Sequence, residues 1–456
     1  MDPSDRALLA HGAANVRDFI ANGMITARAH AEALIARIET FDPDIHAFAH
    51  FDADHLRAQA DRADARRQAG ALLGPLHGVP VAVKDVIDTA DAPTQNGAAL
   101  DRGRRPSADA AVIARLRAAG ALVMGKTTTC ELAFLHPSAT RNPAAPDRTP
   151  GGSSSGSAAA VAAGLAPLAL GTQTGGSVIR PASFCGVVGF KPSFGAIARR
   201  GVLKQSPSLD TVGVFSRDVG GAALLAEACI GADPDDPSDA RPGASGLYAT
   251  AVSAPPVAPI FAWVELPGFA RASDDMRAAL AELLQDLQEA VFTTTLPRLY
   301  NDAATFRARL NDAEMAYHYR AYAERGWDLL SFETRAAIER GRAISAADYL
   351  AARDMRAVLA AGLDEILSRC DAILTPAALG AAPQGLGSTG DSIFNGLFTF
   401  TGHPAVTLPL LLDCDGAPMG VQLVGRRGDD ARLLRAARWL EARFAGGGGE
   451  APTKGP

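Results

Sequence analysis

The sequence has few cysteines, and they form no disulfide or metal-binding pattern. Of its 456 residues only five are cysteine, and no two make a CxxC pair: Cys130, Cys185, Cys229, Cys370 and Cys414. Structural zinc sites and disulfide frameworks depend on paired spacings of this kind. An HExxH motif and clustered His/Cys sets are also missing. We therefore expect reduced core thiols, no metal, and a cytoplasmic protein.

Long apolar runs and clusters of basic residues are absent as well. No apolar stretch is long enough to cross a bilayer, and residues 1–5 lack the basic and then apolar pattern of a signal peptide. The formal net charge is −6, without a Lys/Arg run, which argues against a nucleic-acid surface. The expected partner is a small molecule, with neither membrane nor nucleic acid, and the expected state is a monomer or homodimer.

Apolar residues are plentiful, at 48 % of the chain, which is ample for a large core. Short apolar segments alternate with helical patterns. We predict a helical region over the first seventy residues, with apolar residues at helical spacing in 19–38. Strands are predicted at 79–83, 122–124, 168–170, 372–376 and 420–424, irregular strands and turns over 190–216, and helices at 110–119, 158–163 and 222–229. This alternation predicts an α/β layered fold around a mostly buried sheet.

We find no internal repeat and no convincing linker, so the sequence favours one domain over residues 1–445. The Asp/Pro/Gly-rich segment 231–246 predicts an exposed loop. Residues 303–363 look helical and more charged, as surface helices that cap a pocket do. The glycine-rich end, 446–456, is predicted to be a disordered tail.

Two small-residue stretches, 151–157 (GGSSSGS) and 171–181 (GTQTGGSVIRP), are the most informative part of the sequence. Each presents serine hydroxyls in an uncrowded backbone, as a nucleophile flanked by peptide N–H donors requires. The helix and strand between them should bring the second stretch back to the first. A flexible Gly/Ser linker is the alternative for 151–157, but this stretch leads into a buried helix and strand.

Lys84 follows the apolar strand predicted at 79–83, at the kind of strand end where α/β folds place their chemistry. Loss of solvation there would lower its pKa toward neutrality and make the free amine available as a base. Taken alone, Lys84 is better interpreted as a lysine that simply emerges at a strand end.

Two other patterns are decoys. Residues 120–127 (GALVMGKT) match the phosphate-loop spacing GxxxxGK[ST], but the middle residues are an apolar strand and not an open loop. His77, His136 and His403 show no metal spacing, and no GxSxG elbow anchors a Ser-His-Asp triad. We interpret these histidines as structural.

Three ordered blocks resemble the amidase signature family: 75–85 with 125–127, 151–199 (GGSS, GTQTGGS, FCG, GFKP), and 402–405 with 418–425. The resemblance covers most of the chain and is weakest over 231–380. It implies an α/β/α sandwich with a large mixed sheet, core motifs in 75–220 and 370–443, and a variable pocket region in 231–370. It also implies a cofactor-free serine hydrolase of carboxamide C–N bonds, with aryl amides and carbamates (a urethanase activity) as further substrates.

By this resemblance Ser177 is the nucleophile, Ser153 the bridging serine at a cis peptide bond, and Lys84 the base. Thr172 supports the network. The peptide N–H groups that resemble the oxyanion hole of the family are those of Thr174, Gly175, Gly176 and Ser177.

The chain departs from the family pattern at one informative point. Many relatives carry aspartate and arginine where this sequence has Gln173 and Ile179, and here the arginine is Arg180. This arrangement resembles malonamidase-type members, in which the arginine holds a substrate carboxylate. Alternatively, Arg180 pairs with a protein carboxylate and supports the loop. Aromatic residues of the helical region favour a roomy apolar acyl pocket: Phe306, Tyr317, Tyr319, Trp327 and Phe332.

Two alternative functions remain open. A glutaminyl/asparaginyl-tRNA amidotransferase A-type subunit shares these motifs but needs ammonia channelling and partner subunits. An inactive scaffold that binds a partner is the other, although the intact Lys84, Ser153 and Ser177 speak against it.

Overall fold

The computed structural model describes residues 8–236 and 246–444 and contains one 11-stranded sheet, in the order β1-β3-β2-β4-β6-β5-β10-β11-β9-β7-β8. Its strands are β1 (Phe48–Phe51), β2 (Pro80–Lys84), β3 (Leu122–Thr127), β4 (Leu168–Gln173), β5 (Val188–Lys191), β6 (Thr211–Ser216), β7 (Phe261–Val264), β8 (Val291–Thr294), β9 (Ala372–Pro376), β10 (Ala405–Leu412) and β11 (Pro418–Val424). The sheet is mixed, because β2 runs parallel to β3 and β4 while β6 runs antiparallel to β4.

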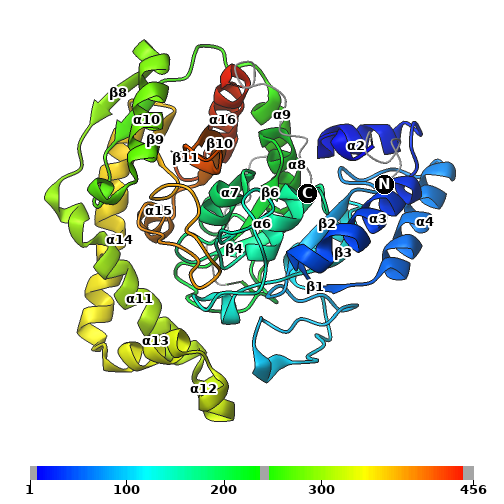
Figure 1. The fold of residues 1–456 in the computed structure, drawn as a ribbon, viewed down its shortest axis with the longest axis horizontal. Helices are drawn as coiled ribbons and strands as arrows, with labels where there is room; N and C mark the ends of the chain where they lie inside the picture. Colours follow the sequence, from blue (N-terminus) through cyan, green and yellow to red (C-terminus); the bar gives the residue numbers. More distant parts are fainter. Residues whose placement is uncertain (1–7, 237–245, 445–456) are drawn as a thin grey trace.

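Helices cover both faces of the sheet (Figure 1). They are α2 (Ala13–Ala21), α3 (Ala27–Ile45), α4 (Ala53–Gln68), α5 (Ala111–Ala118), α6 (Ser155–Ala162), α7 (Ile179–Cys185), α8 (Val219–Cys229), α9 (Leu247–Val252), α10 (Asp274–Leu287), α11 (Ala303–His318), α12 (Arg320–Gly326), α13 (Phe332–Ala343), α14 (Ala346–Leu367), α15 (Gly396–Thr401) and α16 (Asp430–Phe444). None of these helices is long and apolar enough to cross a membrane.

The strand β2 shows why the central strands are apolar on both sides. Val81 and Val83 pack in one cluster with residues of α5, α8 and α16, whereas Ala82 packs in a second cluster with residues of α3, α6 and α7. Side chains alternate across a strand, so a strand covered on both faces must be apolar throughout. The layers are helix, sheet and helix, as predicted.

Most of the predicted elements are present. The strands at 79–83, 122–124, 168–170, 372–376 and 420–424 correspond to β2, β3, β4, β9 and β11. Because β3 is a fully buried strand, residues 120–127 offer no open phosphate loop. The predicted disordered tail, 446–456, and residues 237–245 of the predicted loop lie outside the described residues.

Four strands were not predicted: β1, β7, β8 and β10. The first three have only four residues each, and β10 contains Pro409. Proline donates no hydrogen bond to a neighbouring strand. The pairing of β10 with β11 shifts register between Leu408 and Leu411, and Pro409 lies between these two residues.

The helices α11–α14 occupy the predicted helical region 303–363 and extend away from the sheet, at the lower left of Figure 1. Leu310 of α11 and Leu359 of α14 pack in a third apolar cluster with Phe398 of α15 and Ile373 of β9. The helical region is therefore anchored to the β9 end of the sheet.

Gly156 at the start of α6 gives a test of this packing. A Cβ there would lie 2.2 Å from the Ala47 carbonyl oxygen and 2.5 Å from the Thr128 nitrogen. Because both neighbours are backbone atoms, we expect Gly156→Ala to lower the free energy of unfolding by about 3 kcal/mol or more, measured by denaturant titration.

The matched control is Gly220→Ala in α8, where a Cβ would meet nothing closer than an Asp218 carboxylate oxygen at 3.3 Å. Here we expect unchanged or slightly higher stability, by up to about 1 kcal/mol. Equal effects of the two substitutions would contradict this account of α6.

Candidate active site

Lys84, the last residue of β2, lies in a closed polar cluster. Its Nζ donates to Ser153 Oγ at 2.8 Å and to Thr172 Oγ1 at 2.8 Å. The side chain is completely buried. Burial lowers the pKa of Lys84 to about 7, against the smaller opposing effects of Cys130 and Asp210. At neutral pH a large fraction of this amine is therefore uncharged and able to accept a proton.

The sheet topology explains how these groups meet. Because β2 and β4 are parallel neighbours, with Val83 opposite Leu170, their carboxyl ends share one edge, and Lys84 and Thr172 lie there. The stretch 151–157 contacts the same strand, since Ser154 Oγ donates to the Thr172 carbonyl at 3.2 Å. The two small-residue stretches thus come together as the sequence predicted. The peptide bond between Gly152 and Ser153 is cis.

Ser177 lies in the turn between β4 and α7 and is nearly buried. Within the described residues its hydroxyl makes no hydrogen bond to Ser153 or to any other side chain. The structure therefore joins Lys84 and Ser153 by a hydrogen bond, and the Ser177 hydroxyl has no partner in 8–236 or 246–444.

The turn before Ser177 presents free peptide donors. No acceptor in 8–236 or 246–444 receives a hydrogen bond from the backbone N–H groups of residues 174–177. A Cβ at Gly176 would lie only 2.4 Å from Asn395 Oδ1, so only glycine fits this close approach. Unpaired N–H groups beside a serine hydroxyl are the arrangement that stabilises an oxyanion.

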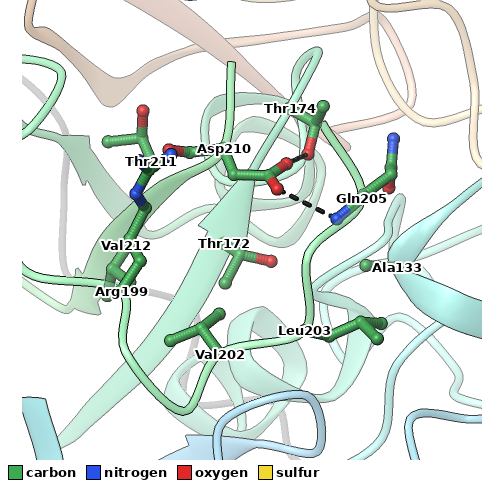
Figure 2. A pocket seen from close by; sticks show the side chains of 10 residues that line it. All are labelled: Ala133, Thr172, Thr174, Arg199, Val202, Leu203, Gln205, Asp210, Thr211 and Val212. Carbon is green, nitrogen blue, oxygen red and sulfur yellow. Dashed lines mark hydrogen bonds between the residues drawn. The ribbon is translucent and has the colours of Figure 1, made fainter. Parts of the chain in front are cut away.

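Asp210, which the sequence analysis missed, supports this turn (Figure 2). It accepts a hydrogen bond from Thr174 Oγ1 at 2.6 Å and from the backbone N–H groups of Gln205 and Ser206. Burial raises the pKa of Asp210 to about 6. The cavity in Figure 2 measures about 10 Å³, which holds one water at most, so what the structure shows for Asp210 is its hydrogen bond to the turn at Thr174. The signal in the sequence that could have identified Asp210 is its position, as an acidic residue directly before the buried strand β6.

Gln173 and Arg180 also hold the turn. Gln173 Oε1 accepts the N–H groups of Val178 and Ile179, at 2.8 and 3.0 Å. Arg180 Nη2 donates to the Gly152 carbonyl at 2.7 Å and to Thr389 Oγ1 at 3.1 Å.

Within the described residues the Arg180 guanidinium forms no ion pair with a carboxylate, and its buried Nε has no hydrogen-bond partner. Desolvation, with a smaller effect of the nearby charge of Arg307, lowers the pKa of Arg180 to about 10 against the opposing effects of Cys130 and Asp391. The alternative in which Arg180 pairs with a protein carboxylate is therefore not supported by the described residues.

The histidines occupy other places. His403 is buried between Thr401 Oγ1 at 2.9 Å and Asp364 Oδ1 at 3.1 Å. His136 pairs with Glu333 at the surface, and His77 is buried. No group of three or more His, Cys, Asp or Glu side chains in the described ranges could hold a metal ion.

A second cavity of about 200 Å³ lies between α11, the loop 266–268 and the segment 392–397. Its lining includes Tyr300, Arg307 and Ser392, but none of the five aromatic residues that the sequence analysis assigned to an acyl pocket. Tyr319 is instead buried and donates to the Leu132 carbonyl, and Phe332 is exposed. Composition alone indicated aromatic residues in this region but not which way they face.

A family comparison decides the class of this protein. The model of the amidase family matches residues 29–434. The chain belongs to the amidase family. It is accordingly a hydrolase that acts on amide C–N bonds, with the fold class predicted from the sequence.

Individual relatives agree. The chain is 38 % identical to the A-type subunit of the glutamyl-tRNA(Gln) amidotransferase of Anaeromyxobacter sp. (strain K), over 90 % of this chain and 91 % of that protein. The solved peptide amidase of Stenotrophomonas maltophilia is 28 % identical, with a TM-score of 0.83 over 95 % of this chain and 97 % of that one. A structure described as a vestigial complex related to an s-triazine catabolic enzyme has 29 % identity and a TM-score of 0.85, over 95 % and 98 %.

Proposed function

We propose that this amidase hydrolyses small carboxamides through an acyl-enzyme, with Ser177 as nucleophile, Ser153 as proton relay and Lys84 as base. The observation that carries the proposal is the buried hydrogen bond between Lys84 Nζ and Ser153 Oγ, at 2.8 Å, beside the Ser177 turn. A neutral amine and two hydroxyls form a base and relay that need neither histidine nor metal.

The steps follow from these positions. Neutral Lys84 accepts a proton through Ser153 as Ser177 Oγ attacks the amide carbonyl carbon. The oxyanion that forms receives hydrogen bonds from the free N–H groups of residues 174–177, and such a donor contributes about 3–4 kcal/mol of transition-state stabilisation. The proton then returns through Ser153 to the leaving nitrogen, and the C–N bond breaks. Water hydrolyses the resulting ester by the same route, while Thr172 orients Lys84.

Within the amide class, we propose a malonamidase-type site in which Arg180 binds a substrate carboxylate. The absence of a carboxylate partner among the described residues supports this role. Aryl amides and carbamates share the acyl carbonyl and C–N bond, so the same machinery would act on them without a cofactor. We propose that the enzyme works as a monomer or homodimer.

A second candidate function is the A-type subunit of a tRNA-dependent amidotransferase, favoured by the 38 % identity to such a protein. That activity requires partner subunits, whereas an independent amidase turns over simple amides alone. An inactive scaffold would do neither and would not react with a fluorophosphonate probe.

The purified chain alone is expected to hydrolyse simple amides, and Ser177→Ala should lower kcat by at least about 1,000-fold because no other group can form the acyl-enzyme. Lys84→Ala should be nearly as severe, and Ser153→Ala less so, since water can partly replace the relay. Ammonia release measures the rates.

Circular dichroism and unfolding midpoints serve as the control for folding. If folded Ser177→Ala keeps more than a tenth of the wild-type rate, the assignment of the nucleophile is wrong. Fluorophosphonate labelling of the wild type, absent in Ser177→Ala, distinguishes an active enzyme from a scaffold.

The pH dependence follows from the lowered pKa of Lys84, about 7. Only the neutral amine is a base, and its fraction falls tenfold per unit below the pKa. We therefore expect kcat/KM to rise with pH up to about 7 and then reach a plateau. A pH profile of the free enzyme on a neutral amide tests this.

His77→Gln and His403→Gln are the controls, and both should keep the acid limb. A folded histidine variant that loses the limb would point to a Ser-His mechanism instead.

Arg180→Ala separates the two roles of this residue. If Arg180 binds a substrate carboxylate, KM for acidic amides should rise by at least about 30-fold, because losing a buried charge partner costs about 2–5 kcal/mol. KM for neutral amides should change far less. Equal losses on both, with a lower unfolding midpoint, would assign Arg180 to holding Gly152 alone.

A further inference from the structure

Arg307 of α11 has no hydrogen-bond or ion-pair partner among the described residues, and it lines the cavity of about 200 Å³. Its Nε is closed to solvent and makes no hydrogen bond, and within the described residues no carboxylate pairs with it. Buried polar donors in proteins are almost always hydrogen-bonded, because an unpaired one costs free energy. A guanidinium left in this state at a cavity wall calls for an acceptor from a ligand.

The nearest carboxylates are already engaged elsewhere. Asp312 and Asp391 act electrostatically on Arg307, but Asp312 pairs with Arg340 at 2.7 Å and Asp391 with Arg271 at 2.7 Å. The positive charge of Arg307 therefore lacks a dedicated counter-charge. Arg307 lies close enough to Arg180 that its positive charge lowers the pKa of Arg180. Two guanidinium groups therefore share this side of the site.

Arg307 borders the turn that carries the proposed oxyanion donors. A Cβ at Gly175 would lie 3.4 Å from Arg307 Nη1 and 3.4 Å from Ser392 Oγ. Gly175 precedes Ser177 by two positions, so Arg307 and Ser392, which both line the cavity, stand beside the turn that leads to the proposed nucleophile. Apolar side chains line part of the cavity wall (Leu266, Ile393 and Leu397), next to the polar Asn301 and Ser392.

We propose that Arg307 joins Arg180 in binding the carboxylate of the substrate, which makes carboxylate-bearing amides the preferred substrate class. The inference rests on the proposed function, since it places this carboxylate beside the Ser177 turn. An apolar wall with a guanidinium on it fits a short aliphatic chain ending in a carboxylate. This carboxylate can lie on the acyl side, as in monoamides of dicarboxylic acids, or on the leaving amine, as in N-acylglycines.

The test compares matched amides on the purified enzyme. Succinamate and glutaramate place the carboxylate on the acyl side, N-butyrylglycine places it on the leaving amine, and each is paired with a neutral amide of similar length. Wild type should favour the charged member of at least one pair. Arg307→Gln should lower kcat/KM for that member by at least about 30-fold, mainly through KM, and affect neutral amides far less.

Two variants sharpen the comparison. Arg307→Lys keeps the charge and should keep part of the preference, although it loses the fork-shaped donor set. Arg309→Gln removes the same charge from the same helix, but Arg309 is exposed and lies 3.9 Å from Asp348. Its substrate preference should equal that of the wild type.

A binding measurement separates failure of this inference from failure of the proposed function. Succinate and glutarate are titrated by calorimetry into Ser177→Ala and into Ser177→Ala/Arg307→Gln. Binding by the first and not by the second supports Arg307 even if no amide is hydrolysed. No preference for charged amides in the wild type, equal losses on both members of a pair, or dicarboxylate binding that survives Arg307→Gln would each overturn the role of Arg307.

Discussion

The proposed chemistry of this protein depends on the burial of one amine without a compensating carboxylate. Lys84 has two hydroxyls as its partners and no ion pair in the described residues. Desolvation penalises its charged form, and hydroxyls compensate less for this penalty than a carboxylate would. The pKa falls to about 7 for this reason, and every step assigned to Lys84 requires that fall.

Two other buried lysines show that a lowered pKa is not sufficient. Lys126, on the neighbouring strand β3, lies 3.8 Å from Asp85 and donates to the Ile87 carbonyl. Lys191 donates to the carbonyls of Pro192 and His403, and burial lowers its pKa to about 7 as well. The carbonyl partners of Lys191 cannot pass on a proton. Lys126 does bond to a hydroxyl, Thr94 Oγ1 at 2.6 Å, but that hydroxyl donates to the Ile87 carbonyl and not to a serine. Lys84 differs because its hydroxyl partner, Ser153, stands beside the Ser177 turn.

The sequence was most informative where function depends on local pattern. Continuous apolar runs, which are typical of strands covered on both faces, predicted β2, β3 and β4. The small-residue stretches predicted the serine turn. Prediction failed for short strands and for β10, in which Pro409 interrupts the pattern. It also missed Asp210 and Arg307, because their significance depends on contacts with Thr174 and Gly175 that are distant in sequence. The aromatic residues of the helical region were assigned to a pocket from composition alone, which does not indicate which way a side chain points.

The connection between β8 and β9 supplies Arg307, whereas Lys84 and Ser177 stand at the ends of β2 and β4 in the middle of the sheet. The proposed catalytic groups and the proposed recognition group therefore belong to different segments of the chain. A lineage could exchange the α11–α14 segment, come to act on a different set of amides, and keep the proposed proton relay unchanged. For protein engineering, this makes the helical segment the part to exchange between relatives and the sheet edge the part to leave untouched.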